Sequence, residues 1–251
     1  MNWMGPIFRR ELVTLIKSRL LWLFAAIMLA SSIIPTFLGI RDSVAGMISQ
    51  AGNWQEIQPV LETSLGFTLW SSSFLVLMLF PLVFGFNVLV VEKAKGVTES
   101  LLVALPRVEP LWWGKSLGVF LPAYVINLII TLLMVAVFNL WIIVPAGGQM
   151  ILPWASLTTS LVTLPFMLLA LVFLLMFLAL IISNSQIVSI AAVLLTVGMS
   201  QVLSRTGIEV NSWNFAWLHL GVGIVIALIT TFLGRSYATK ERIVLSAKAA
   251  R

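Results

Sequence analysis

The sequence predicts an all-α, polytopic membrane protein that forms a single domain over residues 1–251. Of the 251 residues, 60% are hydrophobic and 10% are charged, whereas a water-soluble domain is typically about 25% charged. Apolar runs of about twenty residues recur along the chain, as spanning helices require. The period-two alternation of barrel strands is missing. The chain has no cysteine, so a thiolate metal site is excluded, and no metal site of another kind is predicted.

Six membrane spans are expected from these apolar runs, and the polar segments between them set the boundaries. The predicted spans cover residues 20–40, 67–91, 117–143, 154–182, 187–204 and 215–234. Residues 41–66 are predicted to form a loop with one or two short interfacial helices and a break at Pro59. Residues 92–115 form a charged loop, and residues 235–251 form a basic tail.

The N-terminal segment, residues 6–19, is predicted to form a basic amphipathic helix that lies on the membrane surface. A signal peptide is the less favoured alternative, because the apolar run that follows is too long and lacks a small-residue cleavage site. The apolar face consists of Phe8, Leu12, Leu15 and Ile16, and the basic residues beside it include Arg9 and Arg10.

The distribution of charge predicts a multi-pass protein of the cell membrane with both termini in the cytoplasm. Six spans place both termini and the 92–115 loop on one side, and that side holds thirteen of the fifteen Lys and Arg residues. Basic residues collect on the cytoplasmic side of membrane proteins. The net charge of +6 therefore indicates topology, and no nucleic-acid partner is expected.

The predicted spans contain no Lys, Arg, Asp or Glu, although proton- and ion-coupled transporters usually need an ionisable group there. Asn87, Asn127 and Gln201 are candidates for lining a substrate path, and interhelical hydrogen bonds are the commoner role of such residues. His219 lies near the outer end of the last span, where an interfacial role is expected.

Two enzymatic functions are disfavoured by the motifs. Residues 114–116 (Gly-Lys-Ser) resemble the end of a phosphate-binding loop, but Glu109 occupies the position of the preceding glycine, so this chain is not expected to hydrolyse ATP. Ser200 and His219 could supply the pair of an intramembrane serine protease. However, Gln201 stands where a nucleophile motif would have glycine.

The 92–115 loop has a helical pattern of its own. Val97, Leu101, Leu102 and Leu105 share one face, Gly96 permits the bend from the preceding span, and Pro106 ends the helix. An apolar face beside mixed charge suits a surface for docking a protein partner, and an ordinary positively charged loop is the alternative.

The loop resembles the signature of the type-2 ABC exporter permeases. That signature places Glu, Gly, Glu, Leu-Leu, Pro and then Gly-Lys in this order. Here the matching residues are Glu92, Gly96, Glu99, Leu101, Leu102, Pro106, Gly114 and Lys115. Two positions depart from the pattern: Val97 replaces the usual threonine, with Thr98 one residue later, and Ala94 stands where a second acid is common.

The resemblance implies the permease subunit of an ATP-driven exporter, which is not itself an enzyme. Two such subunits, identical or different, would form the pore in the lipid membrane. Two separate ABC ATPase subunits, which hold the ATP and Mg, would dock on a coupling helix within residues 92–106, with the N-terminal helix as a second contact. The coupling residues would be Glu92, Lys93, Gly96, Val97, Thr98, Glu99, Leu101, Leu102, Leu105 and Pro106.

Two other functions stay open from the sequence. A non-transporting membrane scaffold or assembly factor could use the same loop to recruit a soluble partner without ATP. The intramembrane serine protease is the weaker of the two, for the reason given above. The sequence identifies no transported substrate, because the predicted spans carry no charged pocket.

Overall fold

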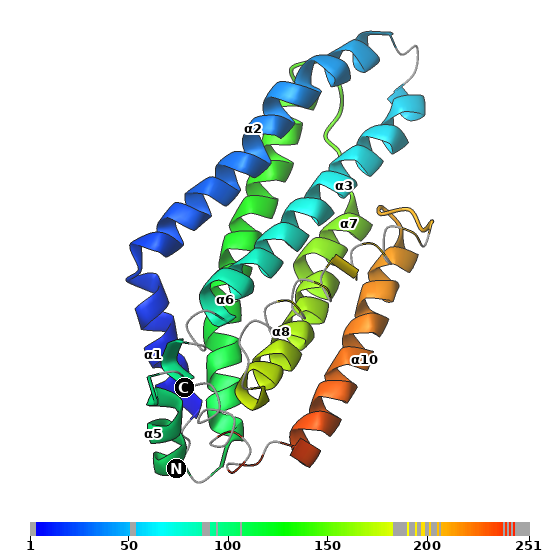
Figure 1. Ribbon diagram of the computed structural model, residues 1–251. Coiled ribbons are helices and arrows are strands. Elements are labelled where there is room, and N and C mark those ends of the chain that lie inside the picture. Colours follow the sequence, from blue (N-terminus) through cyan, green and yellow to red (C-terminus); the bar gives the residue numbers. More distant parts are fainter. Residues whose placement is uncertain are drawn as a thin grey trace.

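The computed structural model describes residues 4–50, 54–86, 91–93, 95–105, 107–182 and 207–237, together with isolated positions between 190 and 243. Within this part every regular element is a helix, and long helices lie side by side in one bundle (Figure 1). The elements are α1 (Met4–Ile16), α2 (Arg19–Gln50), α3 (Trp54–Phe80), η1 (Pro81–Phe86), α5 (Val97–Ala104), α6 (Glu109–Val137), η2 (Phe138–Ile143), α7 (Trp154–Thr158), η3 (Thr159–Thr163), α8 (Leu164–Ile181) and α10 (Trp213–Tyr237).

Four continuous helical segments are long and apolar enough to cross a membrane: Trp54–Gly85, Glu109–Ile143, Trp154–Ile181 and Trp213–Tyr237. A fifth span is present if Met4–Ile16 and Arg19–Ile34, which are bent by 67° at the break between them, are taken together. The predicted span at 187–204 lies outside the described residues apart from isolated positions. The structure therefore shows a helical protein with four or five candidate spans where the sequence predicts six.

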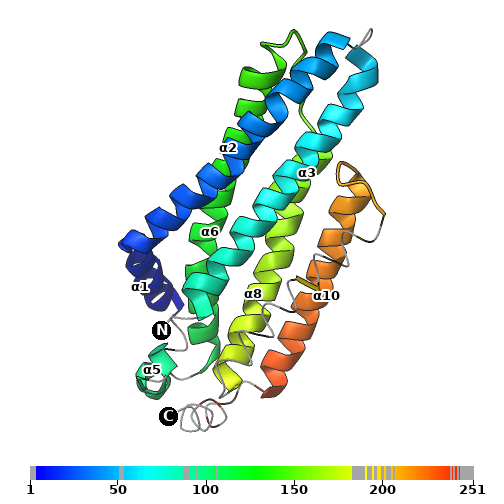
Figure 2. The same ribbon diagram turned by 45° about the horizontal axis from the view of Figure 1, so that its top comes forward.

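The bundle has two chemically different ends (Figures 1 and 2). One end holds α1, α5 and the C-terminal end of α10, and we call it the basic end. The other end holds the end of α2, the start of α3, residues 144–153 and residues 207–212, and we call it the acidic end. Helices α8 and α10 pack against each other and run in the same direction, from the acidic end to the basic end.

The prediction for residues 41–66 is wrong. Helix α2 continues without interruption to Gln50, and α3 begins at Trp54 and contains Pro59. Because Pro59 is the sixth residue of α3, it removes only one backbone hydrogen bond close to the helix end, where little helix precedes it. Side chains of Leu61, Leu65 and Leu69 are fully buried, so packing holds this part of α3 in the bundle.

Three of the long helices change locally to π-helix, in η1, η2 and η3. A π-turn leaves backbone carbonyls outside the regular ladder, and such turns occur often at functional sites. In η3 these carbonyls accept hydrogen bonds from α6: Asn127 Nδ2 donates to the Ser160 carbonyl at 3.1 Å, and the Tyr124 hydroxyl donates to Leu161 at 3.1 Å. The π-turn is thereby tied to the neighbouring span.

The N-terminal helix packs part of its predicted apolar face against the chain itself. Helix α1 packs along the start of α6, and its buried side chains are Ile7, Glu11 and Leu15. Of the predicted face, Leu15 is buried, Phe8 and Leu12 are half-buried, and Ile16 is exposed. The buried face is thus rotated toward Glu11, because α6 supplies an ionic partner for that carboxylate.

Candidate functional site at the basic end

Helix α5 is a short element outside the candidate spans. It begins after Gly96, whose φ of +73° lies in the left-handed region that favours glycine, and it ends at Leu105, whose backbone is extended. The predicted helical segment is therefore present and starts at the predicted glycine. Pro106, predicted to end it, and the side chain of Glu99 lie outside what the structure describes.

The apolar face of α5 packs against the rest of the chain. Leu102 is 2% exposed and Leu105 is equally buried in the main core, and Leu101 packs against the same core. Thr98 is fully buried, and its hydroxyl has no hydrogen-bond partner in the described part of the chain. The prediction that these leucines form a docking face is therefore wrong, because the chain's own core already covers them.

The opposite side of α5 is open. Val103 is 87% exposed, and Ser100 and Ala104 are exposed beside it at helical spacing. Lys95 before the helix and Arg107 after it are exposed as well. We call Ser100, Val103 and Ala104 the outer face of α5. A partner that contacted this helix would meet an apolar side chain between two cations.

An ion cluster connects the segment that precedes α5 to α1 and α6. The Lys115 ammonium is only 3% exposed and donates to Glu11 Oε1 at 2.8 Å and to Glu92 Oε2. The Arg10 guanidinium lies 3.7 Å from Glu92 Oε1. Two cations and two carboxylates balance, and a buried ion pair needs such a balance to offset desolvation.

Two glycines of α6 allow the close approach that the ion cluster requires. A Cβ atom added to Gly114 would lie 2.8 Å from Ile7 Cγ2, and one added to Gly118 would lie 2.7 Å from Glu11 Cβ. Small residues one turn apart let two helices approach closely within a membrane. Residues 114–116, which resemble a phosphate-binding loop in sequence, therefore serve helix packing and ion pairing.

Lys93 caps the C-terminal end of α8. Its ammonium donates to the carbonyls of Ala179, Leu180 and Ile182 at 3.3, 3.1 and 2.7 Å. These carbonyls lack partners within the helix, and a cation suits the negative end of the helix dipole. Burial lowers the pKa of Lys93 from 10.5 to about 8. Lys93 therefore connects the segment before α5 to a spanning helix.

Sequence reasoning missed the main contacts of the segment before α5. Glu92, expected to contact an ATPase, is engaged inside the chain by Lys115 and Arg10. Glu11 was not among the predicted residues. A signal for it exists, since Glu11 lies midway between Ile7 and Leu15 on one helical stripe. An acid within an apolar stripe indicates a buried partner of opposite charge.

A second group of buried polar residues lies between the spans. His219 is fully buried: its Nδ1 donates to the Phe215 carbonyl at 2.8 Å, and its Nε2 accepts from Trp70 Nε1 at 3.1 Å. His219 thus makes an interhelical hydrogen bond between α10 and α3, and its expected position near the membrane interface stays a prediction. Both ring nitrogens are engaged, so neither is free to activate a serine. Ser200 lies outside the described residues.

The predicted path-lining residues have different environments. Asn127 is fully buried between α6 and η3, and its Oδ1 has no hydrogen-bond partner in the part of the chain that is described. Gln201 is helical and exposed, and Asn87 lies outside the described residues. The hydroxyls of Ser160 and Thr163 on η3 are likewise buried without a described partner. Asn127 and η3 thus form a polar patch inside the apolar bundle.

In comparisons with known proteins, the chain matches no protein-family model, no curated protein sequence and no solved structure. The described residues contain no group of three or more His, Cys, Asp or Glu that could hold a metal ion.

Proposed function

We propose that this chain is the membrane-embedded permease subunit of an ATP-driven exporter of the type-2 ABC class. The observation that carries the proposal is the set of contacts at the basic end that connects α5 and the segment before it to the spanning helices. Three of the eight residues that carry the sequence resemblance, Glu92, Gly114 and Lys115, meet at this site. Together with Lys93, they connect the segment before α5 to α1, α6 and α8.

This linkage supports a mechanical role for α5. Its buried face is fixed to the core by Leu102 and Leu105, while Lys93 holds the end of α8 and Glu92 holds the start of α6. A force applied to α5 is therefore transmitted to two spanning helices at once. Signal transfer between sites needs such a rigid element attached to moving parts.

The exposed surfaces of the chain support the following partner arrangement. Two ATPase subunits, which hold ATP and Mg, would bind at the basic end in the cytoplasm and contact the outer face of α5. Exposed apolar side chains on α6 and α10, such as Ile129, Leu132, Leu228 and Phe232, would meet lipid or a second permease subunit. The pore would form between the two permease subunits.

The test first asks whether a neighbouring reading frame encodes an ABC ATPase, as we expect, and then co-expresses that ATPase with this chain for an ATPase assay. We expect a stable complex that hydrolyses ATP, while the chain alone does not. Val103→Asp on the outer face of α5 should weaken the complex at least tenfold. Met150→Asp is the matched control, since Met150 is an exposed apolar residue at the acidic end.

The outcomes separate the candidate functions. A complex with an ATPase that is unaffected by Val103→Asp would contradict the proposed contact. A stable complex with a soluble protein that has no ATPase activity would favour the scaffold function and overturn the exporter proposal.

A further inference from the structure

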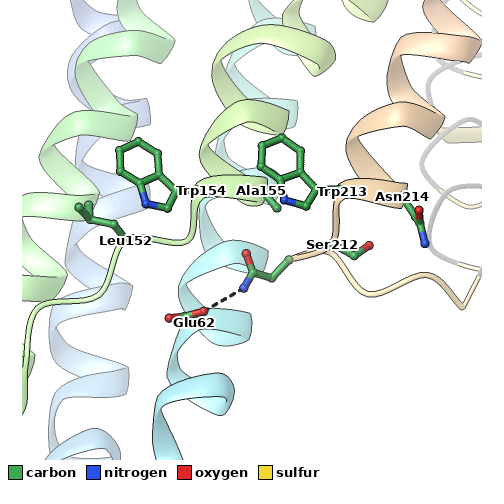
Figure 3. A pocket seen from close by; sticks show the side chains of 8 residues that line it. Glu62, Leu152, Trp154, Ala155, Ser212, Trp213 and Asn214 are labelled. Atoms are coloured by element: carbon green, nitrogen blue, oxygen red, sulfur yellow. Dashed lines mark hydrogen bonds between the residues drawn. The ribbon is translucent and has the colours of Figure 1, made fainter. Parts of the chain in front are cut away.

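The acidic end of the bundle contains an open hollow of about 560 Å³. It is lined by the first turns of α7 and α10, by the segment that leads into α10, and by one residue of α3 (Figure 3). The lining consists of Glu62, Leu152, Trp154, Ala155, Asn211, Ser212, Trp213 and Asn214. The starts of α7 and α10, which line the hollow, lie apart from α5 (Figure 1), so the hollow is separate from the site described above.

The Glu62 carboxylate is held in place by neighbours from two segments. Gln58 Nε2 donates to its Oε1 at 2.8 Å, and Asn211 Nδ2 donates to its Oε2 at 3.4 Å. Asn211 is itself fixed, because its Oδ1 accepts from the Ser156 hydroxyl at 3.0 Å. Figure 3 shows Glu62 directed toward this segment. The carboxylate is therefore preorganised before any ligand binds.

A glycine on α3 makes this arrangement possible. Gly66 lies one turn after Glu62, and a Cβ atom added to it would lie 2.3 Å from the Ser156 Oγ atom. Ser156 is fully buried, so α3 and α7 are in close contact beside Glu62. Glu62 and Trp154 therefore lie on packed helices, which hold a site more precisely than free loops do.

The negative charge of Glu62 is not neutralised within the described part of the chain. Both of its described partners are uncharged amides, and the ion pairs found there all lie at the basic end. A carboxylate with two amide donors and no cation attracts a positively charged group. An anionic ligand is disfavoured for the same reason.

The shape and the rim favour an organic cation over a metal ion. Hard metal ions need several oxygen ligands at close range, and among the described residues that line the hollow Glu62 is the only carboxylate. Trp154 and Trp213 are 66% and 55% exposed at the rim. Their rings extend in the same direction in Figure 3. Indole faces bind alkylammonium groups by cation–π attraction.

We propose that this hollow binds an alkylammonium group, with Glu62 as the counter-charge and Trp154 and Trp213 at the rim. The group can come from a free organic cation or from the head group of a membrane lipid, since exposed tryptophans at a helix end typically lie at the membrane interface. The proposal concerns binding alone and does not rest on the transport function proposed above.

The test uses the purified full-length chain with two ammonium probes and two controls. Choline is titrated calorimetrically against the chain in a neutral detergent, with glucose as a neutral ligand. Retention of phosphatidylcholine relative to phosphatidylglycerol is then measured by native mass spectrometry. We expect saturable binding of at least one ammonium probe and none of glucose. Choline binding identifies a free cation as the source, and selective phosphatidylcholine retention identifies a lipid.

Two variants test the assigned residues. Glu62→Gln keeps the size of the side chain and removes the charge, and we expect it to weaken binding about tenfold or more. Glu56→Gln is the matched control, because Glu56 is an exposed acid of α3 that does not line the hollow. Trp213→Leu changes only the exposed rim, and we expect a severalfold loss of affinity even if Glu62→Gln proves unstable.

Three results would overturn the proposal. The first is equal affinity of the ammonium probe for wild type and Glu62→Gln. The second is the absence of saturable ammonium binding to the wild-type chain, which needs no variant to be informative. The third is preferential binding of glucose, which would assign the tryptophan-lined hollow to a neutral saccharide.

Discussion

At the scale of single residues, Lys115 is the centre of the ion cluster, and its removal leaves two carboxylates without their shared cation. Glu11 is nearly buried, and Glu92 keeps only the more distant Arg10. Breaking a buried ion pair by removing one partner typically costs 3–5 kcal/mol. We therefore expect Lys115→Met to lower the free energy of unfolding in detergent by about 3 kcal/mol. The measurement is reversible denaturation followed by circular dichroism.

The control for Lys115 is Lys95→Met, which changes the net charge equally at an exposed position of the same region. Its effect should stay within about 0.5 kcal/mol, as is usual for surface substitutions. Equal destabilisation by both variants would show that overall charge, and not the cluster, is responsible. A further check is Lys115→Met combined with Glu11→Gln, which should recover part of the loss.

Lys93 gives the chain a pH-dependent contribution to stability. Its pKa is lowered from 10.5 to about 8 by burial, so between these values the unfolded chain binds more protons than the folded chain. Linkage then makes the folded state gain stability as the pH rises from about 8 to 10.5, by at most about 1.4 kcal/mol per pH unit.

The measurement for Lys93 compares the melting temperatures of wild type and Lys93→Met from pH 7 to pH 10.5. Other groups titrate in both proteins, so the difference between the two curves isolates Lys93. We expect the difference to shift in favour of wild type above about pH 8. A constant difference across this range would contradict the lowered pKa.

At the scale of secondary-structure elements, the sequence predicts which segments are helical better than which surfaces their faces contact. The helix at α5 is recognisable because Gly96 and a run of apolar residues at helical spacing delimit it. The same pattern says that Leu102 and Leu105 are buried, yet it cannot say against what. The structure buries them in the chain's own core. The spacing of an apolar stripe is the same whether the stripe packs within its own bundle or against a partner.

The packing of α1 on α6 is also not predicted by periodicity. Phe8, Leu12, Leu15 and Ile16 define an apolar face by spacing, but the buried face includes Glu11. Its partner Lys115 is 104 residues away in the chain. A contact between such distant residues leaves no local signal. By contrast, the span at 154–182 was predicted closely because a long apolar helix needs no partner to be recognised.

The close approach of α1 and α6 predicts the effect of enlarging Gly118. A side chain at this position would clash with Glu11 and displace α1, and overpacking of this kind typically costs 1–3 kcal/mol. We expect Gly118→Leu to lower the melting temperature in detergent and to accelerate tryptic cleavage within α1, where Arg9 and Arg10 are exposed.

Gly221→Leu is the control for Gly118→Leu. Gly221 lies on α10, and a Cβ atom added there would meet nothing within 4 Å. This variant should keep both the melting temperature and the cleavage rate of the wild-type chain. Slow cleavage of α1 in Gly118→Leu would mean that α1 is held by contacts other than its packing on α6.

At the scale of the whole molecule, the two ends of the bundle differ in chemistry, and this difference predicts their placement across the membrane. Outside the balanced ion cluster, the basic end carries Arg9, Lys95, Arg107 and Arg235 on or beside α1, α5 and α10. Glu56, Glu62 and Glu209 lie on segments of the acidic end. Because basic segments stay in the cytoplasm during membrane insertion, we expect α5 to face the cytoplasm and the hollow at Glu62 to face the opposite side.

Single-cysteine labelling tests this orientation directly, since the natural chain has no cysteine and gives no background. Val103→Cys reports the basic end, and Gln149→Cys, an exposed position between η2 and α7, reports the acidic end. In intact bacterial cells a membrane-impermeant maleimide should label Gln149→Cys at once and Val103→Cys only after the membrane is permeabilised. The reverse pattern would place α5 outside the cell, where no ATP-driven partner could act on it, and would overturn the exporter proposal together with the orientation.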